Sequence, residues 1–260
     1  MHTYHMLKSN NMKIPFCISL IFGYASVFGQ NLTVTHSKTL VSDVTADIWS
    51  AKLNDNFSFY EETFESFTKQ EFGSKSRSDG KNEEILEKVS IPQVSDKRGD
   101  LRLTFYTEGT VEKLGLSFLL GYDVWINPND YPDEMERLRK FTREYLRYHY
   151  TQYYNDMIDS DMKLINDYKK SIEKSEKSIS SMRSQITRNE DRLQDETNSN
   201  RRSKLETKNQ QNKADIERLE AEIPEFHQKI SSLDEHILQL KDKLKFVEEQ
   251  YYADENTVQN

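Results

Sequence analysis

Apolar residues recur at alternating intervals of three and four along the C-terminal part of the chain. The residues that follow this spacing are Ile216, Leu219, Ile223, Phe226, Ile230, Leu233, Ile237, Leu240, Leu244, Val247 and Tyr251. This spacing is the heptad repeat of a coiled coil, in which the apolar positions face a partner helix. The pattern therefore predicts a long helix with one apolar seam.

A second, looser repeat precedes the first. Isoleucine or leucine stands at strict intervals of seven at Ile158, Ile165, Ile172, Ile179, Ile186 and Leu193, while the companion positions hold Asp161, Tyr168, Ser175, Met182 and Asn189. The stretch from Gln194 to Ser203 has no apolar residue and suits a bend. Folding the chain there pairs Ile179 with Leu219, which favours an antiparallel hairpin with arms at about 132–195 and 203–252.

Two features of the repeats leave alternatives open. Isoleucine at one core position with leucine at the other is also typical of parallel two-stranded coiled coils, so a dimer is the rival arrangement. The polar residues Asp161, Ser175 and Asn189 in the first arm favour the intramolecular pair, with a weak homodimer through the hairpin as a further possibility. Pro224 lies beside a core position and predicts a kink near Ile223, because proline removes one backbone hydrogen bond.

Residues 31–131 show a different pattern, which predicts one compact α+β domain. Short alternating runs indicate strands, and apolar residues at helical spacing indicate helices. The expected elements are an edge strand at Leu32–His36, a helix at Asp43–Leu53 capped by Ser42 or Asp43, a helical face from Phe57 to Phe72, a polar loop at Ser74–Asn82, and strands at Val89–Ile91, Leu101–Thr107 and Leu114–Ile126. Asp130 is the expected N-cap of the long helix, with Pro132 in its first turn.

The predicted fold class is therefore α+β, with a small antiparallel sheet and one or two helices followed by a long antiparallel α-helical coiled-coil hairpin. The hairpin occupies 132–252, and residues 253–260 are expected to form a disordered tail.

The first residues carry an apolar run typical of an export signal. Basic Lys13 precedes the run from Ile14 to Phe28, which is short for a membrane span of roughly 20 residues. We expect a signal peptide at 1–30, cleaved after Gly29, with Met12 as an alternative start. An uncleaved anchor or a buried first strand remains an alternative, and contact with a membrane is expected only through this segment if it is uncleaved.

Composition and net charge exclude some classes of function for this protein. Hydrophobic residues make up 35% of the chain and charged residues 31%, a balance that fits long solvated helices. The formal net charge of −8 argues against binding to nucleic acid, which needs a basic surface.

Candidate catalytic motifs are missing from the sequence. The only cysteine, Cys17, lies in the predicted signal peptide, and no histidine pair has the spacing of a zinc site. The acidic residues near Asp130 lack the spacing of a calcium loop. We therefore expect no catalytic residues, no metal and no cofactor, and we expect that the protein is not an enzyme.

Aromatic residues crowd where the first arm leaves the α+β domain. The candidate partner contacts are Tyr148, Tyr150, Tyr153, Tyr154 and Trp125. The favoured interpretation of the tyrosines is a stem base packed against the sheet, and a contact surface for a partner or a glycan is the alternative.

The export signal, the segment Asp47–Trp49, the strand before Pro92, the strand Leu101–Phe105 and the charged repeats after Pro132 resemble uncharacterised bacterial envelope proteins. The resemblance implies a periplasmic or envelope location and no chemistry. We expect a non-catalytic exported protein that acts through protein contacts of its head domain and hairpin, with unknown protein partners. An enzyme or ligand-binding site on the α+β domain around Trp125 and Asp130, or a membrane-anchored stalk, are the alternatives.

Overall fold

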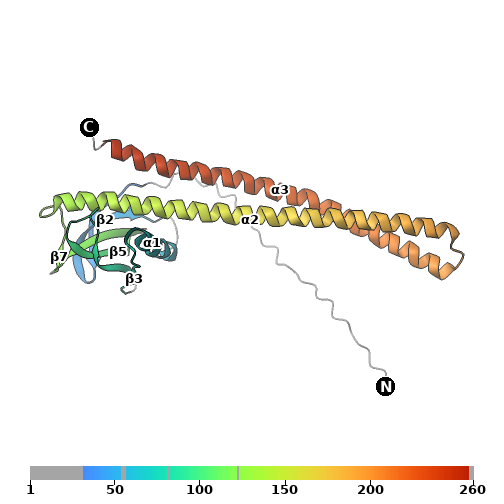
Figure 1. The fold of residues 1–260 in the computed structure, drawn as a ribbon, viewed down its shortest axis with the longest axis horizontal. Coiled ribbons are helices and arrows are strands. Elements are labelled where there is room, and N and C mark those ends of the chain that lie inside the picture. The colour runs from blue at the N-terminus through green and yellow to red at the C-terminus, as the bar shows by residue number, and fades with distance from the viewer. Residues whose placement is uncertain (1–31, 54–56, 81, 122, 258–260) are drawn as a thin grey trace, which may run out of the picture.

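The protein has an α+β fold in which an antiparallel sheet of seven strands is followed by two long helices (Figure 1). The computed structural model describes residues 32–53, 57–80, 82–121 and 123–257. The predicted α+β class, with an antiparallel sheet before long helices, is confirmed. The predicted signal peptide lies outside the described residues.

The elements follow one another in a simple order. They are β1 (Thr35–Val41), β2 (Val44–Lys52), α1 (Phe57–Phe72), β3 (Arg77–Ser78), β4 (Glu83–Ser90), β5 (Arg98–Glu108), β6 (Val111–Leu120), β7 (Val124–Trp125), α2 (Pro132–Asp195) and α3 (Ser199–Thr257). The strand order is β1-β2-β6-β5-β4-β3, and β7 pairs with β6 beyond the end of its pairing with β2. Every pair of neighbours is antiparallel.

The helix predicted at Asp43–Leu53 is wrong, because this segment forms strand β2. Strand β2 lies between β1 and β6, and Ala46, Asp47 and Ile48 are all buried. Burial of both faces removes the alternation that marks a half-exposed strand. Ser42 and Asp43 do not cap a helix: both have positive φ, at 48° and 65°, and form the two-residue turn between β1 and β2.

Other boundaries also differ from the sequence prediction. The edge strand is Thr35–Val41 instead of Leu32–His36, and the expected polar loop contains β3. The last predicted strand is interrupted after Leu120 and resumes as β7. At the other end, α3 continues to Thr257, so the expected tail is helical over 253–257.

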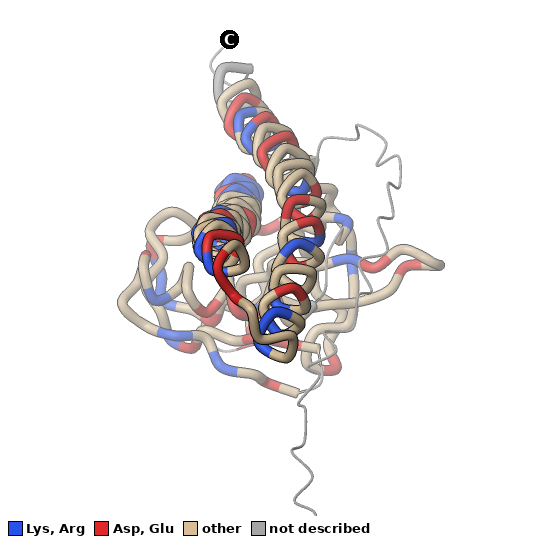
Figure 2. Tube along the Cα trace, turned by 90° about the vertical axis from the view of Figure 1, so that its right-hand side faces the viewer, with Lys and Arg blue, Asp and Glu red and all other residues tan. Residues whose placement is uncertain are grey.

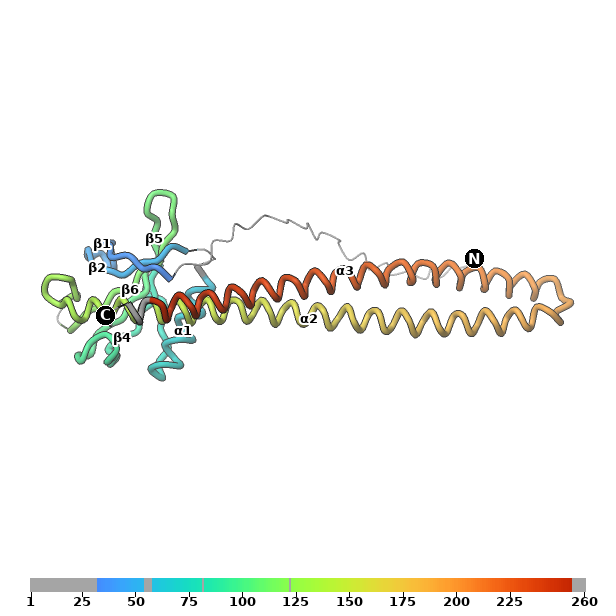
Figure 3. The backbone as a smooth tube through the Cα atoms, turned by 90° about the horizontal axis from the view of Figure 1, so that it is seen from above, coloured from blue at the N-terminus to red at the C-terminus, as the bar shows by residue number. Residues whose placement is uncertain are grey.

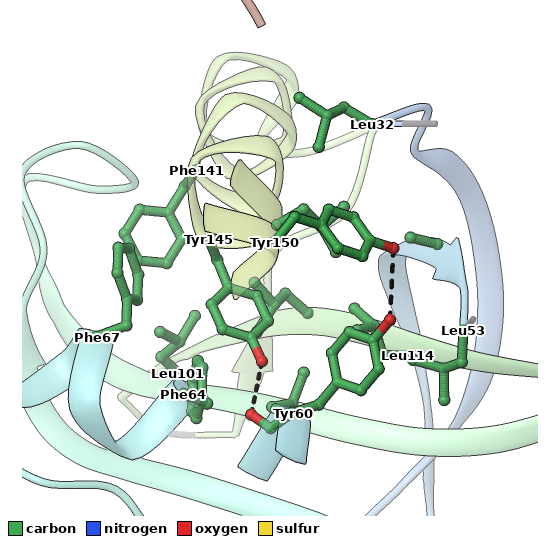
Figure 4. Close-up of a cluster of buried hydrophobic side chains, with 14 of the residues drawn as sticks. Leu32, Leu53, Tyr60, Phe64, Phe67, Leu101, Leu114, Phe141, Tyr145 and Tyr150 are labelled. Carbon is green, nitrogen blue, oxygen red and sulfur yellow. Dashed lines mark hydrogen bonds between the residues drawn. The ribbon is translucent and has the colours of Figure 1, made fainter. Parts of the chain in front are cut away.

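The main core lies between the sheet and the helices. Helix α1 and the first part of α2 pack on one face of the sheet, where Phe64, Phe67 and Tyr145 are almost fully buried beside Leu101 and other strand residues (Figure 4). The Trp49 indole, on β2, donates a hydrogen bond of 2.7 Å from Nε1 to the Met135 carbonyl in the first turn of α2. This bond fixes the start of α2 over the sheet.

Replacing Trp49 by phenylalanine tests this anchor. The smaller ring keeps most of the apolar packing but removes the hydrogen bond, so we expect a loss of about 1 kcal/mol in the free energy of unfolding. Urea unfolding followed by circular dichroism measures the change. No loss of stability would show that the bond does not help to fix α2.

The opposite face of the sheet carries a smaller core. Ala46 and Ile48 alternate with Trp49 along β2 and pack with Val41, while Tyr106 and Trp125 cover them in part. The β1–β2 turn reaches across to β4, where the Ser42 backbone N–H donates to Glu83 Oε1 at 2.9 Å. The sheet is therefore curled over this second core.

The long helices lie side by side over much of their length (Figures 1 and 3). Helix α2 has 64 residues, which corresponds to roughly 96 Å at the helical rise. Its N-cap is Tyr131, without a side-chain cap, and not Asp130 as expected. The connection to α3 spans only 196–198, which is shorter than the predicted bend, and α3 is helical through Pro224.

Several contacts join α2 to α3. Ile179, Ile186 and Ile216 form one buried cluster, with Leu219 and Ile223 packed against it. Near the connection, Asn189 Nδ2 donates a hydrogen bond of 2.8 Å to Asn209 Oδ1. These contacts link positions that fall in the two apolar repeats of the sequence.

Candidate functional site

The aromatic residues predicted as partner contacts lie at the base of α2, and they differ in exposure. Tyr150 and Tyr154 retain 1% and 2% of their accessible surface, so neither ring can meet a partner in this structure. Tyr148 and Tyr153 are half-buried and pack against the same core. Only these two of the four tyrosines keep accessible surface for a contact, whereas Tyr150 and Tyr154 are packed into the base of the stem.

Trp125 lies away from these tyrosines, on β7. Its half-buried ring packs against the second core formed by Val41, Ala46 and Ile48. Asp130, the other residue of the alternative ligand site, lies in a turn in which Asn127 Oδ1 accepts hydrogen bonds of 3.0 Å from the backbone N–H groups of Asn129 and Asp130. The structure thus gives Asn127 a role in shaping this turn.

A buried histidine occupies the centre of the aromatic cluster. His149 is fully buried on α2, and its ring stacks on Tyr60 of α1 with 3.7 Å between the ring centroids. Its Nδ1 lies 2.7 Å from Thr63 Oγ1. The Thr63 hydroxyl lies within 3.0 Å of the Phe59 carbonyl, so it can donate there and accept from Nδ1–H. In that arrangement Nε2 carries no proton, and it has no hydrogen-bond partner among the described residues.

Burial controls the ionisation of this cluster. It lowers the pKa of His149 to about 3, because the charged imidazolium would lose its hydration without gaining a counter-ion. Burial also raises the pKa of Tyr145, whose hydroxyl donates a hydrogen bond of 2.7 Å to the Tyr60 carbonyl (Figure 4). The cluster is therefore neutral near pH 7 and joins α1 to α2 by stacking and hydrogen bonds.

An arginine holds the β1–β2 turn on the sheet. Arg102 Nη1 donates to Asp79 Oδ2 at 2.6 Å and to Ser42 Oγ at 2.5 Å, and it lies 3.3 Å from Glu83 Oε2. The hydrogen bond from Arg102 lowers the pKa of the Asp79 carboxyl, although burial acts in the opposite direction. These groups connect β5 with the turn and with the segment before β4. Their chemistry is that of a structural ion-pair network.

The part of α2 and α3 beyond the head presents apolar side chains to solvent. Met162, Leu164 and Leu238 are exposed by 51%, 45% and 63%, respectively. Figure 2 shows basic and acidic residues distributed along both helices. These exposed apolar side chains are accessible to a partner protein, whereas Tyr150 and Tyr154 are buried.

The described residues offer little for other chemistry. Within 32–53, 57–80, 82–121 and 123–257, no group of three or more His, Cys, Asp or Glu side chains is arranged to hold a metal ion. None of the helices in that part of the chain combines the length and apolar character needed to cross a membrane. Comparison with protein-family models, curated proteins and solved structures finds no match.

Proposed function

We propose that this chain is a non-catalytic exported or envelope protein that acts through protein contacts, made by its α+β head and by a coiled-coil hairpin formed from α2 and α3. The length of α2 and α3 beyond the head is the observation that carries this proposal (Figure 3). Beyond Ile165 and Ile237 the two helices leave most of their surface in water, and their buried residues form a cluster separate from the core of the head. The use of this part is therefore to present a surface at a distance.

Side-chain contacts support the coiled-coil part of the proposal. The apolar cluster of Ile179 and Ile216 continues toward the head through Ile165 and Ile237, which belong to the main core. Asn189 and Asn209 bond to each other within this seam. A buried polar pair of this kind favours one register of two helices over shifted ones.

Exposed apolar residues support the contact part of the proposal. Single apolar residues on a surface are ordinary, but Met162 and Leu164 of α2 and Leu238 of α3 are exposed on the two helices that extend beyond the head. The location rests on the sequence alone, through the apolar run Ile14–Phe28. Sequencing the N-terminus of the mature protein tests cleavage after Gly29 and separates an exported protein from a membrane-anchored stalk.

Spin labels test the arrangement of the two helices. We expect labels at Glu173 and Glu225, which are exposed beside Ile172 and Phe226, to lie within roughly 30 Å of each other, because paired helices are 8–10 Å apart and each label adds a linker. Pulsed electron paramagnetic resonance of the diluted monomer measures this distance. Labels at Glu173 and at Gln70, an exposed residue of α1 on the head, give a second distance as a control. Separations of many tens of ångströms between Glu173 and Glu225 would contradict the hairpin.

Photo-crosslinking in the native cell tests the contact function. We expect a photoreactive amino acid at Met162 or Leu238 to capture a defined protein, identified by mass spectrometry, because these side chains are exposed and apolar. Ser160, a polar exposed position on α2 outside the apolar seam, is the matched control. Equal capture at all three positions, or capture at none, would count against the proposal.

A further inference from the structure

The middle segments of the two long helices carry opposite net charges. Residues 163–188 of α2 have seven basic and three acidic side chains, a net charge of +4, whereas residues 210–235 of α3 have three basic and seven acidic ones, a net charge of −4. The contacts Arg183–Glu220 and Asn189–Asn209 place these segments at similar distances from the head. The α2–α3 pair is therefore a ribbon with a basic edge and an acidic edge.

Part of this charge is unpaired within the described chain. The ion pair between Arg183 and Glu220 crosses from one helix to the other. Six exposed residues have no ion-pair partner among the residues that the structure describes, and these are Lys163, Lys169, Lys174, Glu217, Glu225 and Glu235. They are available to a partner that brings the opposite charges.

Few classes of partner complement the charges of both edges at the same time. The edges are separated by about the 8–10 Å between packed helices, which is close to the Debye length of about 8 Å at physiological ionic strength. A uniform polyanion attracted to α2 would meet the acidic α3 beside it, and a polycation would meet the basic α2. A fitting partner must carry both signs side by side at the same spacing, and a second copy of this chain does.

We propose that the protein forms a homodimer in which α2 of each copy lies against α3 of the other through these segments. The inference rests on the proposed contact function and names the partner. A two-fold axis makes both contacts equivalent, because each copy gives one basic and one acidic edge. The paired segments are roughly 39 Å long and two helix diameters wide, an area of about 800 Å² per copy, which is typical of specific interfaces.

A hollow lined by two isoleucines and six polar or charged residues lies within the same segments. It has a volume of about 500 Å³, and Ile179 and Ile223 line it together with Arg183 and Glu220. Ile223 is half-buried in the single chain. A second copy would cover this hollow, which adds burial of apolar surface to the charge attraction.

Analytical ultracentrifugation of the mature chain tests the dimer. We expect a dimer at about 0.15 M salt that weakens at least about tenfold in Kd at about 1 M, where the Debye length falls to about 3 Å. One variant carries Lys163→Glu, Lys169→Glu and Lys174→Glu, and a second carries Glu217→Lys, Glu225→Lys and Glu235→Lys. Each variant alone gives two edges of the same sign and should be monomeric.

An equimolar mixture of the two variants is the decisive arm. One variant then has two acidic edges and the other two basic edges, so a heterodimer should form with affinity near that of the wild type. Circular dichroism checks that each variant is helical, and if one is not, the salt dependence of the wild type decides. A monomeric wild type, a dimer insensitive to salt, variants that still self-associate, or a mixture that stays monomeric would each overturn the dimer. Crosslinking to a different protein would remain a separate test of the contact function.

Discussion

Gly99→Ala is expected to destabilise the head by about 3 kcal/mol, the upper part of the range for inserting an atom into a packed core. A Cβ atom at Gly99 would lie 2.4 Å from the Leu119 carbonyl oxygen and 2.7 Å from the Phe118 ring. The backbone oxygen belongs to the β5–β6 ladder, where Gly99 pairs with Leu120, and it cannot move without breaking that pairing. The new methyl group therefore strains two central strands.

Gly121→Ala is the matched control. A Cβ atom at Gly121 meets no heavy atom within 4 Å, and its φ is not in the left-handed region. Urea unfolding of both variants, followed by circular dichroism, measures the difference. Equal stabilities would contradict the close approach of β6 to Gly99, whereas a loss confined to Gly99→Ala supports the curled sheet.

Acidification should weaken the head through His149. The pKa of His149 is lowered to about 3 in the folded chain, so the unfolded chain, with a histidine pKa near 6.5, binds the proton more readily. Stability is therefore fully present above about pH 6.5 and is lost as the pH falls toward 3. Between about pH 7.5 and about pH 5 we expect a loss of about 2 kcal/mol in the free energy of unfolding.

His149→Phe isolates this effect. Phenylalanine retains a flat ring for stacking on Tyr60 and cannot be protonated, and Thr63 still has the Phe59 carbonyl as an acceptor. Burial raises the pKa of Glu84, so protonation of Glu84 on acidification stabilises the folded state and opposes the effect of His149. The effect of His149 is therefore the difference between the stability profiles of the wild type and the variant. Urea unfolding across the pH range should show a flatter profile for His149→Phe. Identical profiles would mean that His149 is not the titrating group.

The sequence predicts the long helices better than it predicts the sheet. Isoleucine recurs along α2 at strict intervals of seven, and the predicted first arm has the bounds of α2, because a helix packed along one seam leaves a clear period. Strand β2 has no such period, since Ala46, Asp47 and Ile48 are all buried. Pairing between distant strands, such as β2 with β6, depends on contacts that local patterns do not encode.

The candidate site was predicted only in part. A crowded run of tyrosines is visible in the sequence, but their burial depends on packing against α1. Tyr60 and Thr63 of α1 contact His149 although they lie far from it in the sequence. The spacing of Tyr145 and His149 by one helical turn is the signal that could have placed His149 on the buried face. The network around Arg102 joins residues from three segments and leaves no local pattern.

The described chain begins beside the end of α3. The Leu32 backbone N–H donates a hydrogen bond of 3.0 Å to Gln250 Oε1, and the neighbouring Gln250 carbonyl accepts one of 2.9 Å from Arg143 Nη2 on α2. Any attachment made through the residues before Leu32 is therefore made next to the end of the two long helices that lies at the head. The connection at 196–198 lies some 50 residues farther along α2, which gives it a reach of roughly 75 Å from such a tether.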